Sequence, residues 1–154
     1  MPKQVPARPK STPTSASQAP VDVPVVQTPS EIWKDLPDEH DYPAAQSFLS
    51  LLMPAKRAKK VATSFKKAPI EKHPAKDVLR SAQLDLLAKN DPSVVRDLAK
   101  VKAGEQLSPV LIIRGDAQRG IRAVVADGYH RVCASYHLSE NELIPCRLID
   151  YPNN

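Results

Sequence analysis

Aromatic residues and cysteines are scarce in this chain of 154 residues. Phe, Trp and Tyr together make up 5% of it, and the only cysteines are Cys133 and Cys146. Two cysteines without a secretory signal are typical of free thiols in a reducing compartment, not of a disulfide framework. A run of about 18 apolar residues, which a transmembrane helix needs, is absent, and so is the apolar core of a signal peptide at the N-terminus. We therefore expect a cytoplasmic protein that makes no use of a membrane.

The positive charge of the chain is concentrated in one segment. The formal net charge is +5, and the region from Lys56 to Lys76 holds eight Lys or Arg residues against one acid, Glu71. Such segments favour acidic partners such as DNA through phosphate contacts that read no bases, although most of them are simply solvated faces. The candidate DNA contacts in this segment are Lys56, Arg57, Lys59, Lys60, Lys66 and Lys67.

Three regions are expected along the chain. Residues 1–30 contain seven prolines among small and polar residues. This composition buries too little apolar area to offset the entropy of ordering, so we predict a disordered tail that tethers the chain or docks a protein partner. Residues 31–68 are predicted to be a basic, helical extension, and residues 69–154 a compact domain.

The extension is predicted to be a helical hairpin, with helices at residues 41–53 and 55–67. Asp41 is a candidate cap for the first helix, and Pro54 ends it. Each helix has an apolar stripe that can pack beside the main domain. The stripes are Ala44, Ala45, Phe48, Leu49 and Leu52 in the first helix, and Ala58, Val61, Ala62 and Phe65 in the second.

The pattern of residues 69–154 predicts a small α+β domain. Residues 75–80 fit either an extended segment or one helical turn. The remaining elements are expected to be a helix capped by Asp91 and running from Pro92 to Lys102, a strand at Val110–Ile113 buried on both faces, a strand at 122–126, a helix from Tyr129 to Leu138 and a strand at 144–149.

The junction at Gly128 is the strongest candidate for a binding site. A short apolar strand ends there, and the helix that follows carries His130 and Arg131 in its first turn. Free backbone N–H groups at a helix start bind anions readily, and a guanidinium can grip a phosphate with two parallel hydrogen bonds. The residues from Gly128 to Arg131 therefore predict a phosphate or nucleotide site.

Taken in order, these elements resemble the ParB/sulfiredoxin superfamily over roughly residues 70–151. The resemblance implies a mixed sheet with packed helices, and a glycine turn that binds the phosphates of ATP or CTP with Mg²⁺. It is carried by Asp77-Val78-Leu79-Arg80, the helix after Asp91-Pro92, Leu107 to Arg114, Asp127-Gly128-Tyr129-His130-Arg131, and Ile144-Pro145-Cys146-Arg147-Leu148.

The resemblance also assigns expected roles to individual residues. Gly128, Tyr129, His130 and Arg131 would form the phosphate cradle, with Arg80 as a further nucleotide contact. Asp127 would hold the metal–nucleotide complex or act as a general base, and His130 would donate to a phosphate or shuttle a proton. Alternatively, Asp127 caps the helix, His130 makes a structural hydrogen bond, Arg131 pairs with a nearby acid and Tyr129 packs or stacks as a ring.

Two departures from the family pattern restrict its function. Tyr129 stands where sulfiredoxin has its catalytic cysteine, so the attacking sulfur of that reaction is missing and sulfiredoxin activity is not expected. Partition proteins follow this domain with a helix-turn-helix that reads DNA, and this sequence shows none.

Three functions remain open from the sequence. The first is a ParB-like nucleotide-binding protein, with or without nucleoside triphosphatase activity, that associates with DNA through its basic segment. The second is a metal-dependent DNA nuclease with Asp127 and His130 at its centre, and the third is a non-enzymatic adaptor. Zinc is not favoured, because no second cysteine pair supports a site formed by His130, Cys133, His137 and Cys146.

Overall fold

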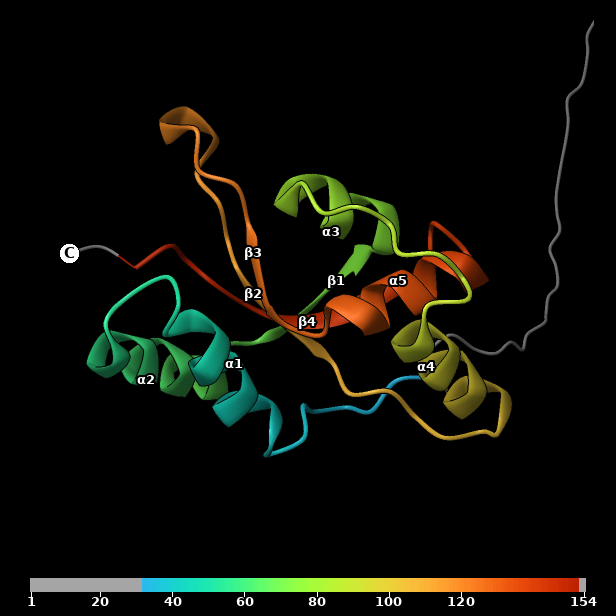
Figure 1. Cartoon of the computed structure of the whole chain (residues 1–154). Coiled ribbons are helices and arrows are strands. Elements are labelled where there is room, and N and C mark those ends of the chain that lie inside the picture. The colour runs from blue at the N-terminus through green and yellow to red at the C-terminus, as the bar shows by residue number, and fades with distance from the viewer. Residues whose placement is uncertain (1–31, 153–154) are drawn as a thin grey trace, which may run out of the picture. The chain divides into compact units, whose positions relative to one another are not determined.

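A mixed sheet of four strands lies at the centre of the part that the computed structural model describes, residues 32–152 (Figure 1). The strands follow the order β1 (Ile70–Pro74), β4 (Leu143–Ile149), β2 (Val110–Ile113) and β3 (Val124–Asp127). β4 runs parallel to β2 and antiparallel to β1, and β3 runs antiparallel to β2. The expected α+β class is confirmed. The predicted disordered tail at residues 1–30 lies outside the described residues.

Both faces of the sheet are covered by helices. Val110 and Ile112 of β2 belong to the core shared with α3, α4 and α5, whereas Leu111 and Ile113 belong to the core shared with α1 and α2. Successive side chains of a strand point to opposite faces, so a strand with helices on both sides is apolar at every position. The prediction that Val110–Ile113 is buried on both faces is therefore confirmed.

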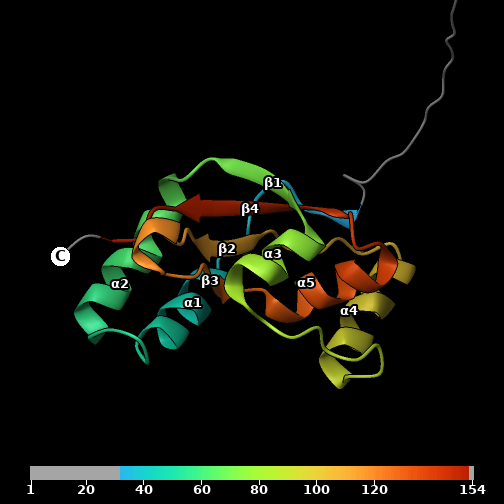
Figure 2. The same ribbon diagram turned by 90° about the horizontal axis from the view of Figure 1, so that it is seen from above.

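The basic extension folds as a pair of helices, as predicted, and it packs in the same compact unit as the sheet, Glu31–Asn154. α1 spans Asp41–Leu49, so it ends before residue 53 and Pro54 does not end it. α2 (Ala55–Ser64) continues into the short 3₁₀ helix η3 (Phe65–Lys67), which matches the predicted range 55–67. The views in Figures 1 and 2 place α1 and α2 at one end of the unit and α4 at the other.

The apolar stripe predicted for α2 is confirmed, but the one predicted for α1 is partly wrong. In α2 and η3 all four stripe residues are buried. In α1 the buried face is formed by Asp41, Tyr42, Ala45 and Leu49, while Phe48 is 41% exposed. Asp41 is not a cap either, because it is the first helical residue and its carboxylate is turned into the protein. Ala44 and Leu52, also predicted for this stripe, are exposed.

The helices of the C-terminal region follow their local signals closely. α4 spans Pro92–Lys102, and the Asp91 carboxylate accepts hydrogen bonds from the N–H groups of Ser93 and Val94, as the sequence predicts for an N-cap. α5 spans Tyr129–Leu138. The ambiguous stretch at residue 75 forms helix α3, Ala75–Ala82. Strand β1 has no counterpart in the sequence prediction, because its side chains alternate weakly and include Pro74.

No helix within residues 32–152 combines the length and the apolar character needed to cross a bilayer.

Two phenylalanines of the hairpin provide a matched test of this packing. Phe65 is fully buried between the hairpin and the sheet, whereas Phe48 is 41% exposed. We expect Phe65→Ala to lower the free energy of unfolding by about 3–5 kcal/mol, because it removes buried apolar surface and leaves a cavity. Phe48→Ala is expected to change it by only about 0.5 kcal/mol. Urea denaturation of both variants measures the difference, and equal effects would contradict the packing described here.

Candidate functional site

The junction between β3 and α5 has the strand–glycine–helix form predicted from the sequence. Gly128 adopts a left-handed conformation with φ of 110° at the start of α5. A Cβ atom at this position would lie 2.8 Å from a methyl group of Val110 and 3.0 Å from Nη2 of Arg131. Only glycine satisfies both the backbone angle and the close approach. The helix start is therefore held tightly against strand β2 and against the side chain of Arg131.

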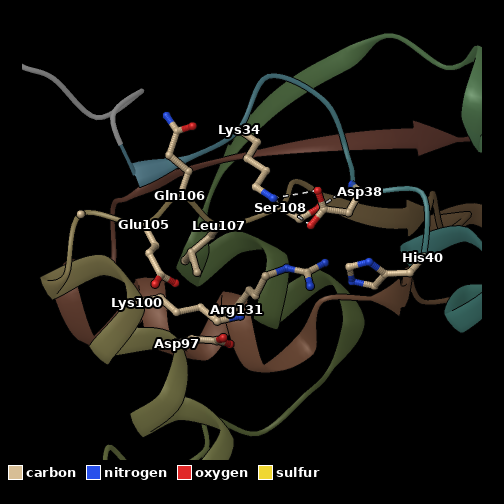
Figure 3. Close-up of a pocket in the computed structure, with 11 residues that line it drawn as sticks. Lys34, Asp38, His40, Asp97, Lys100, Glu105, Gln106, Leu107, Ser108 and Arg131 are labelled. Carbon is tan, nitrogen blue, oxygen red and sulfur yellow. Dashed lines mark hydrogen bonds and ion pairs between the residues drawn. The ribbon is translucent and has the colours of Figure 1, made fainter.

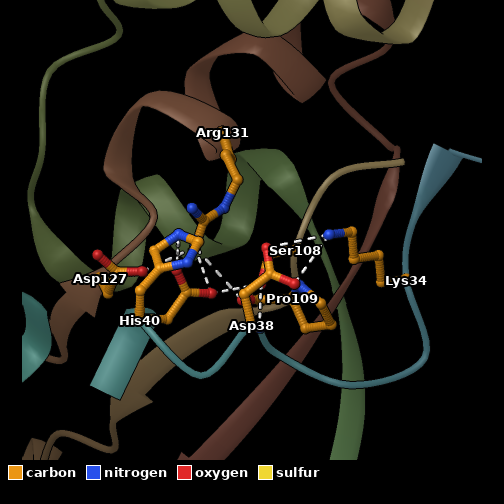
Figure 4. Close-up of polar contacts among 8 residues, drawn as sticks. Lys34, Asp38, His40, Ser108, Pro109, Asp127 and Arg131 are labelled. Carbon is orange, nitrogen blue, oxygen red and sulfur yellow. Dashed lines mark hydrogen bonds and ion pairs between the residues drawn. The ribbon is translucent and has the colours of Figure 1, made fainter. Parts of the chain in front are cut away.

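Arg131 is turned inward and joins several elements. Its Nη2 lies 2.9 Å from Oδ2 of Asp127 at the end of β3 and 3.7 Å from Oδ2 of Asp41 at the start of α1 (Figure 4). The same nitrogen donates to the carbonyl oxygen of Pro109, at 3.4 Å. The Arg131 side chain is 17% exposed and that of Asp127 is 19% exposed. Of the readings left open by the sequence, the structure shows Arg131 paired with nearby acids.

Asp41 is fixed from other directions as well. It is 2% exposed, and its carboxylate accepts a hydrogen bond from the hydroxyl of Ser108. The ring of His40 lies 3.4 Å from its other oxygen. Ser108 in turn accepts a hydrogen bond from the N–H of Asp38, whose carboxylate accepts two from Lys34 at 2.8 and 3.0 Å. These contacts tie the segment before α1 to the loop that leads into β2.

An open pocket of about 610 Å³ lies beside this cluster, and Arg131 forms part of its wall (Figure 3). Its charged side chains come from four separate parts of the chain, namely the segment before α1, the helix α4, the loop after α4 and the helix α5. Pockets of this size accommodate small-molecule ligands. The basic residues of the wall are Lys34, His40, Lys100 and Arg131, and the acidic ones are Asp38, Asp97 and Glu105.

One nitrogen of the Arg131 guanidinium keeps its hydrogen-bonding capacity. All of the contacts above use Nη2, and among residues 32–152 no acceptor is found for Nε or Nη1. The Nε atom is buried, whereas Nη1 is not. The N–H groups of Nη1 can donate to a ligand, and hydrogen bonds from a guanidinium to a phosphate or carboxylate are charge-assisted and strong. The side chain can therefore hold its carboxylates and an added anion together.

The other predicted nucleotide contacts are not gathered in this pocket. Tyr129 packs against the core, and its hydroxyl donates to the carbonyl oxygen of Asp85 at 2.5 Å. The His130 side chain is exposed, with its ring centroid 5.6 Å from that of Tyr129, and it does not line the pocket. Arg80 lies on α3, is 82% exposed and pairs with Asp77 at 3.0 Å. Of the four residues predicted to form the phosphate cradle, only Arg131 reaches the pocket wall.

Asp127 does not fit the magnesium-binding role that the resemblance implies. One of its oxygens is committed to Arg131. Burial raises the pKa of Asp127 above the ordinary value of 3.8, and the neighbouring Asp41 carboxyl raises it further, while Arg131 opposes the rise. In the part of the chain that the structure describes, no group of three or more His, Cys, Asp or Glu side chains is arranged to hold a metal ion. Asp127 is therefore assigned to the ion pair with Arg131 and not to a metal ion.

The two cysteines are core residues. Cys133 and Cys146 are fully buried and free. Burial raises the pKa of both thiols, that of Cys146 to about 12, so neither is a ready thiolate nucleophile or ligand. The ring of His137 lies 2.7 Å from the carbonyl oxygen of Leu87, which fastens the loop before α4 to α5. These positions are structural.

The candidate DNA contacts divide into two groups. Arg57 donates to the carbonyl oxygen of Pro152 at 3.0 Å, and Lys66 lies 3.2 Å from Glu39 and 5.0 Å from the ring centre of Tyr42. The second group is exposed to solvent and forms no ion pair with any residue in the range 32–152. Its members are Lys56, Lys59, Lys60 and Lys67.

Most of the pocket could not be found from the sequence. Lys34, Asp38 and His40 lie in a segment expected only to precede a helix, and Lys100 lies on a helix to which the sequence assigns no site. Their relevance comes from tertiary proximity to Arg131. The one local signal is Asp41, an acid at a helix start, which the sequence predicts to be a cap.

Comparison with known proteins adds no assignment. No family model, no curated protein and no solved structure matches this chain. The resemblance to the ParB/sulfiredoxin superfamily therefore stays a hypothesis that depends on the residues quoted above.

The two aspartates bound to basic side chains are expected to titrate on opposite sides of 3.8. The pKa of Asp127 is raised by burial, and that of Asp38 is lowered by its hydrogen bond from Lys34. The stability that Asp127 contributes is present at low pH and is lost as the pH rises above 3.8 through its folded-state pKa. That of Asp38 is present above 3.8 and is lost as the pH falls through its lowered pKa. Carboxyl ¹³C NMR titration measures both, and a midpoint for Asp127 at or below 3.8 would contradict the burial argument.

Proposed function

We propose that this chain is a ParB-like nucleotide-binding protein that holds the phosphates of its ligand in the pocket beside Arg131. The observation that carries the proposal is that Nη1 of Arg131 has no acceptor among residues 32–152, while its side chain lies on the wall of a pocket of about 610 Å³ that three further basic side chains share. A phosphate has the charge and the acceptor oxygens that a guanidinium nitrogen binds well.

The neighbouring residues support an anion at this point. Lys34 and Lys100 supply mobile point charges, and His40 adds a donor at the start of α1. Lys34 has three donors, of which the contacts to Asp38 use two, so it can bind a phosphate oxygen without leaving its partner. In the view of Figure 3, the guanidinium of Arg131 and the ring of His40 face one another across one side of the pocket.

The proposal is for binding and includes no hydrolytic step. Asp127 is committed to Arg131, and His130 does not line the pocket. No geometry among the described residues therefore gives these two side chains the roles of metal ligand and proton carrier that a triphosphatase or nuclease would require.

A conservative change at Arg131 tests this proposal. Arg131→Lys keeps a positive charge between Asp41 and Asp127 but removes the planar guanidinium, and with it the N–H groups of Nη1. We expect isothermal titration calorimetry to show ATP or CTP binding by the wild-type chain. The variant should bind about 10–100-fold more weakly, because hydrogen bonds to a charged group contribute about 1.5–3 kcal/mol.

The control for this experiment is Arg119→Lys, an exposed arginine outside the pocket, which should leave the affinity unchanged. Urea denaturation of each variant separates loss of binding from loss of the fold. Absence of binding by the wild-type chain at millimolar nucleotide, or equal affinity for wild type and Arg131→Lys, would refute the proposal.

A second function, association with DNA, is favoured by the solvated lysines of the extension. Lys56, Lys59 and Lys60 lie three and four residues apart on α2, so they share one helix face, and no acid lies on α2 to neutralise them. We propose that this face contacts the phosphates of DNA without reading its sequence.

The salt dependence of DNA binding tests the second function. We expect the logarithm of the association constant to fall linearly with the logarithm of salt concentration. In the quadruple variant K56Q/K59Q/K60Q/K67Q the slope should flatten by about 0.9 for each DNA phosphate that the protein no longer neutralises. The matched control K72Q/K76Q/K89Q/K102Q removes the same charge from other exposed lysines. Equal effects of the two variants would show that only net charge matters and would contradict a contact at α2.

A further inference from the structure

Asp97 is a buried carboxylate on the wall of the same pocket. It lies in the middle of α4, is 7% exposed and lines the same cavity as Arg131. Among residues 32–152, no group donates a hydrogen bond to its carboxylate and no ion pair includes it. The pattern of the sequence assigns no role to this residue.

An ionised carboxylate that is nine-tenths buried without a protein donor is unfavourable, because it has lost most of its contact with water and no protein group replaces it. The two other acids beside Arg131 have donors, since Asp41 accepts from Ser108 and Asp127 accepts from Arg131. The missing donor at Asp97 is therefore expected to come from the occupant of the pocket. An ionised carboxylate only accepts hydrogen bonds, so the facing part of the ligand must carry N–H groups and not phosphate.

We propose that Asp97 is a specificity-determining residue that accepts hydrogen bonds from the nucleobase, and that it selects bases with amino groups. This inference rests on the proposed nucleotide binding. It places the phosphates at Nη1 of Arg131 and the base at α4. In the view of Figure 3, Lys34 and Asp97 lie on opposite sides of the Arg131 side chain, which separates an anion-binding part of the pocket from an N–H-accepting part.

The chemistry of the bases sets an order of affinity. Guanine offers two adjacent donors, N1–H and the N2 amino group, which match the two oxygens of one carboxylate. Adenine and cytosine each offer an exocyclic amino group. Uracil has one N–H between two carbonyl oxygens, which the carboxylate repels. Asp97 therefore predicts the affinity order guanine, then adenine and cytosine, then uracil.

Competition among nucleoside triphosphates tests the role of Asp97 in the full-length chain. We expect GTP to bind about ten-fold or more tightly than UTP. Inosine triphosphate lacks only the N2 amino group of GTP, and it should also bind about ten-fold more weakly than GTP. This comparison is made on the wild-type protein, so it does not depend on the folding of any variant.

Asp97→Asn is the matching change in the protein. An amide can donate as well as accept, so the preference for GTP over UTP should fall about ten-fold. Asp85→Asn is the control, since it makes the same change at an exposed acid outside the pocket, and it should leave the order unchanged.

The outcomes separate the two proposals. Equal binding of GTP, inosine triphosphate and UTP by the wild-type chain, or an unchanged order in a folded Asp97→Asn variant, overturns the role of Asp97 and leaves nucleotide binding standing. Failure of every nucleotide to bind at millimolar concentration overturns both.

Discussion

A single guanidinium between one buried and one partly buried carboxylate holds together the parts of this protein that form the site. Arg131 is on α5, Asp127 ends β3 and Asp41 begins α1. Removing one partner from such a group leaves an uncompensated buried charge, which costs far more than an exposed ion pair contributes. The start of α5, the end of β3 and the start of α1 are therefore constrained to one arrangement. The helical extension is joined to the central sheet through this contact as well as through its apolar face.

The same constraint shapes the pocket. Because Nη2 makes the contacts to the carboxylates, the N–H groups of Nη1 have no acceptor among the described residues. Lys34 and His40 reach the pocket because hydrogen bonds through Asp38, Ser108 and Asp41 hold their segment against the loop before β2. The wall of the pocket thus holds the donors of Arg131 and the acceptor Asp97 on α4. Such a wall offers donors to an anionic group and an acceptor to N–H groups.

Local signals predicted the elements whose stability is decided locally. Asp91 followed by Pro92 marks a helix start whatever surrounds it, and Gly128 between an apolar strand and Tyr129 marks a strand-to-helix turn for the same reason. Where contacts with distant parts of the chain decide the structure, the prediction from sequence was incomplete. Phe48 satisfies helical spacing and is nonetheless exposed, because the face of α1 that meets the sheet is selected by the buried Asp41. Strand β1 owes its conformation to pairing with β4, which no pattern within Ile70–Pro74 reveals.

The sequence by itself indicated the α+β class, the basic helical hairpin and an arginine in the first turn of a helix. Each of these depends on residues only a few positions apart. Which way that arginine turns was settled by folding. Asp127, four residues earlier in the chain, and Asp41, at the start of α1, lie beside the same nitrogen, which is turned inward, away from the exposed His130. The pocket and the buried Asp97 arise from segments that meet only when the sheet is assembled, so no pattern of spacing could have shown them.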